Sequence, residues 1–104
     1  MKVTDSDTDW AKIFIAGPLE QIEAIVREYV STGHCVTVTP TKYIYKYGEE
    51  KGVIIGLINY PRFPRSKGVL FDEAVELGNR IMEECHQGSF TVMTPEDTVL
   101  YDRR

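Results

Sequence analysis

The segment VIIGLINYPRFP, residues 53–64, shows where the centre of the fold lies, because a fully apolar run ends abruptly in a short polar and aromatic loop. Residues 53–58 are typical of a strand that is buried on both faces. In the loop that follows, Arg62 lies between Pro61 and Pro64, and each proline fixes its own φ and restricts the residue before it. The pattern predicts a central strand that ends in a rigid, preformed loop.

This loop provides the first candidates for a binding site, because a loop of fixed shape can bind a ligand without first being ordered. The alternative is that its two aromatic side chains cap the core while Arg62 is solvated. A second candidate segment is the Gly-Pro turn that ends an earlier apolar strand. The predicted ligand-binding residues are therefore Asn59, Tyr60, Arg62, Phe63, Gly17 and Pro18.

Two amphipathic helices are predicted from apolar residues that recur at steps of three and four. The first begins with Pro18 in its opening turn and ends before Gly33, which suits a left-handed stop. The second begins after Ser66, a plausible N-cap, and ends near Gly88.

Period-two alternation and turn residues predict the remaining strands, at residues 12–16, 35–47, 89–94 and 98–101. The second of them contains Pro40, where we expect a break or a bulge. The glycines of residues 48–52 predict a hairpin connection that leads back into the central strand.

This order of elements matches the ferredoxin-like βαββαβ plan, an α+β two-layer sandwich, with an extra C-terminal strand. The first and third strands lie at the centre of such a sheet, whereas Pro40 and Lys46 suit an edge strand. The alternative is a small parallel α/β fold. In that fold Gly17 and Asn59 would converge at one edge of the sheet, where α/β proteins bind ligands.

Two helices can cover only one face of the predicted sheet, so the other face must expose apolar residues or be covered by something else. We expect self-association through this open face, as a homodimer, with interface residues Tyr43, Tyr45 and Tyr47. The competing interpretation is that the C-terminal hairpin, or Trp10 with the N-terminal segment, covers the face within one chain.

The 104 residues are enough for one domain, which we place at residues 10–104, preceded by a flexible acidic tail at residues 1–9. The net charge of −4 argues against nucleic acid as a partner. The sequence contains neither a signal-peptide pattern nor an apolar run of roughly 18 residues, so we expect a cytoplasmic protein without membrane contact. Cys35 and Cys85 are expected to be free thiols.

No motif in the sequence identifies a reaction. The acidic residues of the second helix, Glu73 and Glu76 among them, are assigned to its solvated face. We predict no metal site and no cofactor, since the histidines and cysteines lack ligand spacing. The leading interpretation is a small non-catalytic binding or regulatory module whose ligand is a protein or a small molecule such as a nucleotide. An inhibitor of another protein is an alternative.

The segments KIFIAGPL (residues 12–19) and GHCV (residues 33–36) resemble the opening of nucleoside 2-deoxyribosyltransferase-like proteins. The later segment SKGVLFD (residues 66–72) is similar to the start of the helix that carries the catalytic glutamate in that family. The resemblance implies a nucleoside- or nucleotide-binding protein, or a degenerate enzyme of this kind, and it puts Asp72 at the catalytic position. An aspartate there departs from the family pattern.

Overall fold

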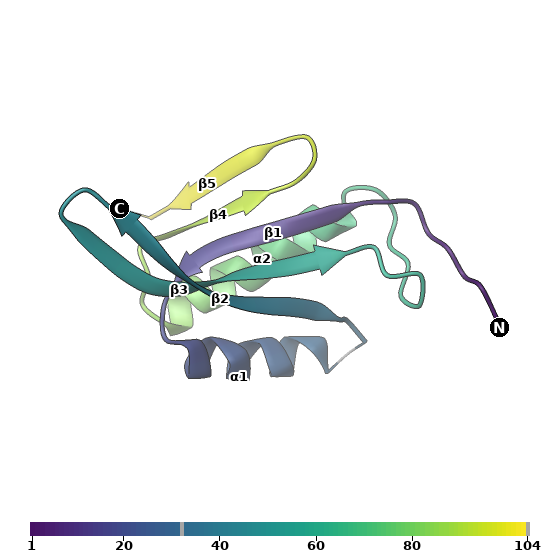
Figure 1. The fold of residues 1–104 in the computed structure, drawn as a ribbon, viewed down its shortest axis with the longest axis horizontal. Helices are drawn as coiled ribbons and strands as arrows, with labels where there is room; N and C mark the ends of the chain where they lie inside the picture. The colour runs from purple at the N-terminus through teal and green to yellow at the C-terminus, as the bar shows by residue number, and fades with distance from the viewer. Residues whose placement is uncertain (32, 104) are drawn as a thin grey trace.

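The computed structural model describes residues 1–31 and 33–103, which form an antiparallel sheet with two helices on one face (Figure 1). The elements of this described part follow the order β1 (Trp10–Ala16), α1 (Leu19–Val30), β2 (Val36–Tyr45), β3 (Gly48–Ile58), α2 (Val69–Glu84), β4 (Ser89–Met93) and β5 (Thr98–Asp102). None of the helices described is long and apolar enough to span a membrane.

The strand order is β2-β3-β1-β4-β5, and every neighbouring pair is antiparallel. This order confirms the ferredoxin-like prediction with an extra C-terminal strand, and the parallel alternative is wrong. β1 and β3 run in opposite directions, with Trp10 opposite Ile58 and Ala16 opposite Gly52. Gly17 and Asn59 therefore leave the sheet at opposite ends.

The core lies between the sheet and the helices. Alternate residues of the two central strands point into it, and each is at most 2% exposed: Ala11, Ile13, Ile15, Val53, Ile55 and Leu57. The apolar faces of α1 and α2 pack against them through side chains such as Ile22 and Leu77. Strands of this composition pair well because β-branched side chains fit a pleated surface.

The β2-β3 hairpin is longer and more regular than predicted. The register is continuous from Val36 opposite Leu57 to Tyr45 opposite Gly48, so Pro40 neither breaks nor bulges β2. β2 is an edge strand, where a missing N–H need not interrupt the ladder. The turn is also displaced, since it lies at residues 46–47, where Tyr47 has a φ of 73°, and not at residues 48–52.

α2 begins at Val69, later than the predicted cap at Ser66. Gly68 occupies the N-cap position with a φ of 89°, which a glycine adopts readily. In the middle of the helix, Gly78 lets the helix approach β4 closely, because a Cβ added there would overlap the Phe90 ring. Phe90 is itself buried and stacks on Tyr101 of β5. A side chain larger than hydrogen at position 78 would therefore require α2 or the Phe90 ring to move.

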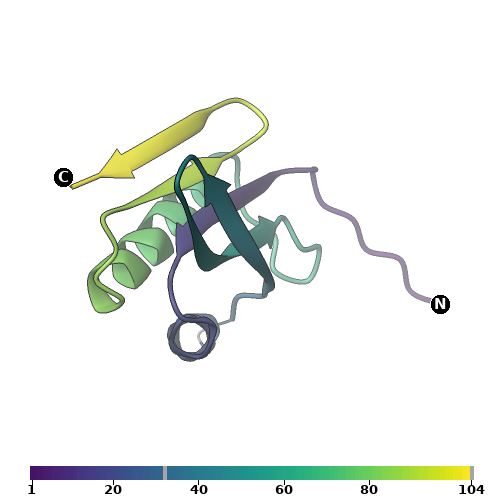
Figure 2. The ribbon, with the colours of Figure 1, turned by 60° about the vertical axis from the view of Figure 1, so that its left-hand side comes forward.

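The face of the sheet away from the helices stays open, because β5 extends the sheet sideways beyond β4 instead of folding across it (Figure 2). The strand register puts Phe14, Ile54 and Leu100 in one row across this face. Leu100 is 61% exposed, and the other two side chains are partly buried. The C-terminal hairpin therefore does not cover this face of the sheet.

Candidate functional site

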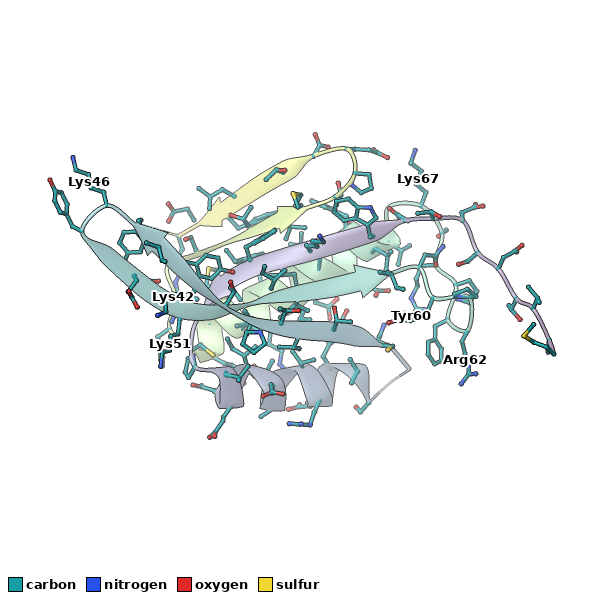
Figure 3. All side chains as sticks on the ribbon, in the orientation of Figure 1. Lys42, Lys46, Lys51, Tyr60, Arg62 and Lys67 are labelled. Atoms are coloured by element: carbon teal, nitrogen blue, oxygen red, sulfur yellow. The ribbon has the colours of Figure 1, made fainter. Side chains whose placement is uncertain are left out.

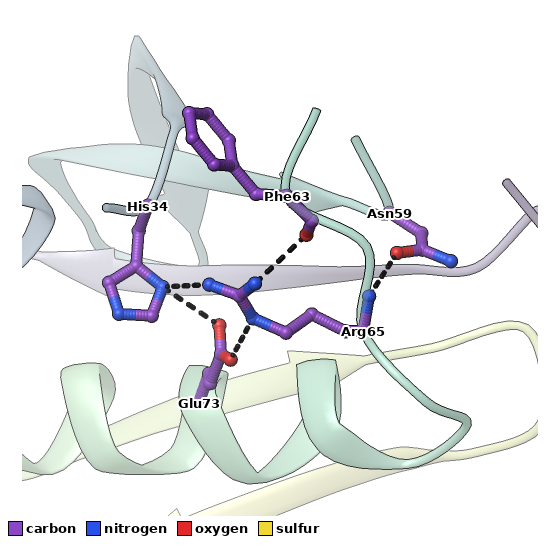
Figure 4. Close-up of polar contacts among 5 residues, drawn as sticks. All are labelled: His34, Asn59, Phe63, Arg65 and Glu73. Carbon is purple, nitrogen blue, oxygen red and sulfur yellow. Dashed lines mark hydrogen bonds and ion pairs between the residues drawn. The ribbon is translucent and has the colours of Figure 1, made fainter. Parts of the chain in front are cut away.

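A polar cluster lies where β3 ends, between the loop that follows it and the first turns of α2 (Figure 4). Its members are Arg65 from the loop, Glu73 from α2 and His34 from the segment before β2. Their side chains are only 24%, 15% and 21% exposed. Charged side chains are rarely withdrawn from water to this degree unless they are paired.

Arg65 connects the cluster through its whole guanidinium group. Nε donates to Glu73 Oε1 at 2.7 Å, and Nη1 donates to the carbonyl oxygen of Phe63 at 2.9 Å. Nη2 lies 2.9 Å from His34 Nδ1. The Arg65 guanidinium therefore connects the loop after β3 to α2 and to the segment before β2. Charge-assisted hydrogen bonds of this kind are among the stronger ones in proteins.

His34 connects the cluster to α1, because it contacts both Glu73 and Tyr29. Its Nδ1 lies 3.4 Å from Glu73 Oε2, and its ring stacks on Tyr29 with centroids 4.9 Å apart. Burial, followed by the charges of Glu73 and Glu76, raises the pKa of Tyr29 to about 12. Tyr29 therefore stays protonated at neutral pH, and its ring closes the cluster toward α1.

Asn59, the first residue after β3, is 8% exposed and lies behind the loop. Its Oδ1 accepts a hydrogen bond from the Arg65 backbone N–H at 2.7 Å, and its Nδ2 donates to the carbonyl oxygen of Asp7 at 2.8 Å. The amide therefore fixes the loop from inside and also contacts the N-terminal segment.

Tyr60, Phe63 and Cys35 form a wall on the outer side of the cluster. The Tyr60 hydroxyl is hydrogen-bonded to the Cys35 thiol, and this bond is the main reason that the pKa of Tyr60 is raised. The space between the wall and the cluster is only about 10 Å³, close to the smallest that holds one water molecule. The cluster is thus filled by its own side chains and is no pocket.

The opposite side of the same wall faces a cleft of about 780 Å³. Cys35, Tyr60, Arg62 and Phe63 line one side of it, and Lys2 and Thr4 of the N-terminal segment line the other. Figure 3 shows Tyr60 and Arg62 extending from the loop at the end of the molecule opposite the β2-β3 hairpin tip with Lys46. A volume of this size is in the range of small-molecule sites.

The arrangement offers binding groups more than acid-base groups. Two aromatic rings and two cations, from Arg62 and Lys2, line the cleft, and its described lining contains no carboxylate, while Glu73 is paired with Arg65 behind the wall. Such a surface can hold a planar or cationic group against the rings and an anionic group against the cations. Among the residues that the structure describes, no three histidines, cysteines or acids form a metal site.

The structure brings four of the predicted site residues together and leaves two elsewhere. Asn59, Tyr60, Arg62 and Phe63 belong to the loop just described. Gly17 and Pro18 lie at the other end of the sheet, where the Gly17 N–H donates to the carbonyl oxygen of Lys51. That these six residues bind one ligand stays a prediction, and the geometry divides them between two places.

Asp72 and the three tyrosines lie away from this cleft. Asp72 lines a separate cleft of about 390 Å³ beside the β4-β5 turn, on another side of α2. Tyr43 and Tyr45 share the open sheet face, but Tyr47 is 94% exposed in the hairpin turn and leaves the predicted stripe. The Tyr43 hydroxyl donates to the carbonyl oxygen of Val53 at 2.5 Å, so its ring lies over Gly52.

Sequence reasoning missed the polar cluster. The prediction that Glu73 lies on the solvated face of α2 is wrong, since its carboxylate is paired with Arg65 and its side chain is 15% exposed. A signal was present, because Glu73 stands three residues after Leu70 and four before Leu77, within the apolar stripe of the helix.

Comparison with solved structures finds the same fold in phage SAM lyase. The apo enzyme matches with a TM-score of 0.76 and 18% identity, over 100% of this chain and 96% of that chain. The complex with S-methyl-5'-thioadenosine matches with a TM-score of 0.67 and 18% identity, over 98% of this chain and 95% of that chain. No protein-family model and no curated protein matches the sequence.

These neighbours overturn two expectations from the sequence. The resemblance to nucleoside 2-deoxyribosyltransferase-like proteins is wrong, because the fold is that of a SAM lyase and the sheet is antiparallel. The short strand-Gly-Pro-helix segment that suggested it arises wherever a strand turns tightly into a helix. The interpretation as a non-catalytic module is also contradicted, since the same architecture carries an enzyme with a nucleoside ligand in its solved complex.

Proposed function

We propose that this chain is an enzyme that binds SAM and cleaves it to S-methyl-5'-thioadenosine, and that the cleft in front of Cys35, Tyr60 and Phe63 is its substrate site. The observation that carries the proposal is the match with phage SAM lyase over at least 95% of both chains. A likeness of that extent involves the whole architecture, including the fifth strand, and not only a common core motif.

The chemistry of the cleft fits the parts of the substrate. SAM combines an adenine ring, a sulfonium cation and an amino-acid carboxylate. Tyr60 and Phe63 supply aromatic faces, which attract both planar rings and cations. Arg62 supplies a cation for the carboxylate, and its position on a loop bounded by two prolines reduces the entropy lost on binding.

The reaction makes modest demands on acid-base catalysis. Release of S-methyl-5'-thioadenosine breaks the bond between the sulfonium sulfur and the γ-carbon of the methionine chain, and its electron pair stays on the sulfur. A carboxylate oxygen of the same substrate bonds to the γ-carbon in its place, so the amino-acid portion leaves as a lactone. The leaving group is then a neutral thioether, which needs no proton. The protein therefore contributes chiefly by orienting the substrate and excluding water, tasks for which a rigid loop is suited.

Incubation of the purified protein with SAM, followed by chromatography with mass detection, tests the proposal directly. We expect S-methyl-5'-thioadenosine to accumulate in proportion to protein concentration. Tyr60→Ala removes one aromatic face from the cleft wall and should lower kcat/KM at least tenfold, whereas Tyr47→Ala, at the exposed hairpin tip, should leave it unchanged. The absence of product, together with no thermal stabilisation by millimolar S-methyl-5'-thioadenosine, would refute the proposal.

We also propose that the protein self-associates through the open sheet face, as a homodimer. Exposed Leu100 and Ile58, at 61% and 48%, together with Phe14 and Ile54, support this proposal, since apolar side chains gathered on one face are typical of interfaces. Light scattering should give twice the monomer mass for the wild type and the monomer mass for Leu100→Glu. The matched control is Ile44→Glu, which lies on the other side of the hairpin; a monomeric wild type at high concentration would refute this part.

A cytoplasmic location remains part of the proposal. It is supported by the two cysteines, which are free thiols in the structure, with Cys35 exposed and Cys85 buried.

A further inference from the structure

We propose that the N-terminal segment, residues 1–9, is a strap that forms the second wall of the substrate cleft, and that Asn59 is the positioning residue that holds it there. The inference rests on the proposed function in so far as the cleft is taken as the substrate site. Figures 1 and 2 show the segment leaving β1 on the same side of the molecule as the loop that follows β3.

Three of the four polar groups of Asn59 bond to the N-terminal segment, and the fourth bonds to the loop. Its backbone N–H donates to the carbonyl oxygen of Asp9 at 3.0 Å, and its carbonyl oxygen accepts from the Ser6 hydroxyl at 2.5 Å. Its side-chain Nδ2 donates to the carbonyl oxygen of Asp7 at 2.8 Å. The fourth group, Oδ1, accepts from the Arg65 N–H at 2.7 Å.

The asparagine side chain suits this position because it donates on one side and accepts on the other. An aspartate could still accept from Arg65, but it would turn a carboxylate toward the carbonyl oxygen of Asp7. Departure of the strap would exchange these three hydrogen bonds for bonds to water, so together they stabilise the bound position by the net free energy of three hydrogen bonds. We call these three hydrogen bonds from Asn59 to residues 6–9 the latch. The latch opposes release of residues 6–9 from the loop.

The latched strap has a consequence for the cleft. With residues 6–9 fixed, residues 2 and 4 face the loop, and Lys2 lies across the cleft from Tyr60 and Arg62. Within the described residues neither Lys2 nor Arg62 makes an ion pair. Two unpaired cations on opposite walls favour an anionic group between them, and SAM carries a carboxylate at its amino-acid end.

Amide hydrogen exchange, which needs no ligand, tests the latch. Asn59→Asp should speed exchange at the position-59 amide at least tenfold, because its acceptor at Asp9 moves away, while amides of α1 stay protected. Asn79→Asp, an exposed change of the same kind on α2, is the control and should alter neither. Unchanged exchange at position 59 would overturn the latch, as would a uniform loss of protection across the whole chain.

Substrate kinetics test the wall. Lys2→Gln should raise KM for SAM about threefold to fivefold at constant kcat, the size expected for one exposed charge pair. It should not change the affinity for S-methyl-5'-thioadenosine, which lacks the carboxylate. Lys46→Gln, at the hairpin tip, is the control. Equal effects of Lys2→Gln on both ligands, or none on SAM, would overturn the role of the strap. If the wild type does not act on SAM, the proposed function fails, and the exchange experiment still decides the latch.

Discussion

Replacing Glu73 by glutamine should loosen the loop that carries Tyr60 while leaving the rest of the fold in place. Glutamine keeps the size of the side chain and one acceptor for Arg65 Nε, but it removes the charge that neutralises the guanidinium at 2.7 Å. Arg65 would keep its bonds to the Phe63 carbonyl oxygen and toward His34. The loop would then be held by weaker, neutral contacts on the helix side.

The magnitude follows from the burial of the pair. Exposed ion pairs contribute about 0.2–1 kcal/mol, and loss of one partner from a fully buried pair costs about 3–5 kcal/mol. With side chains 15% and 24% exposed, the Glu73–Arg65 pair lies between these cases. We expect Glu73→Gln to lower the free energy of unfolding by about 1.5–2.5 kcal/mol, close to the value of a hydrogen bond to a charged group.

Urea denaturation followed by circular dichroism measures this change as a shift of the midpoint at constant slope. A double-mutant cycle with Arg65→Met should give a coupling energy of at least about 1 kcal/mol. The matched control is Glu23→Gln, which breaks a 4.0 Å pair with Arg27 that is largely exposed, and it should change stability by less than about 0.5 kcal/mol. If Glu73→Gln has no larger effect than Glu23→Gln, the ion pair does not hold the loop.

Three further changes test other parts of the structure. Gly78→Ala should destabilise the protein by about 1–2 kcal/mol in urea denaturation, because the new methyl group overlaps the buried Phe90 ring. Alanine is the better helix former, so a gain in stability would contradict the close packing of Gly78 against Phe90. Because the pKa of Tyr29 is raised to about 12, the unfolded chain loses this proton first, so the contribution of Tyr29 to stability should be fully present below about pH 10 and fall as the pH rises toward 12. Tyr29→Phe should reduce this loss of stability between pH 10 and 12, measured by urea denaturation at each pH. If the variant loses as much stability as the wild type, groups other than Tyr29 cause the loss. Tyr43→Phe should cost about 0.5–1.5 kcal/mol through the lost hydrogen bond to the Val53 carbonyl oxygen, and no change in the urea midpoint would show that this bond contributes nothing.

The fold could be predicted from the sequence because its strongest signals are local and periodic. The apolar run at residues 53–58 identified a central strand, and Pro40 identified an edge strand. Element boundaries were less accurate where turn chemistry decides them. The hairpin turns at residues 46–47 because Tyr47 adopts a positive φ, which composition alone disfavours for a tyrosine.

The candidate site was predicted only in part, for a physical reason. The loop residues Tyr60 and Phe63 are neighbours in sequence, so their shared position could be inferred from the two prolines. The cluster behind them joins His34, Arg65 and Glu73, which come from three separate segments and meet only when the sheet has formed. Pairing at such distances depends on strand order, and no local pattern in one sequence reports it.

The central place of β1 in the sheet has a consequence for how the chain folds. β1 is synthesised before both of its partners, β3 and β4, and Lys12 pairs with Met93, which lies far from it along the chain. Such non-local pairing must overcome the entropy of closing long loops, so we expect folding in milliseconds to seconds and not in microseconds. During translation one hydrogen-bonding edge of β1 would therefore stay unpaired until β4 has left the ribosome.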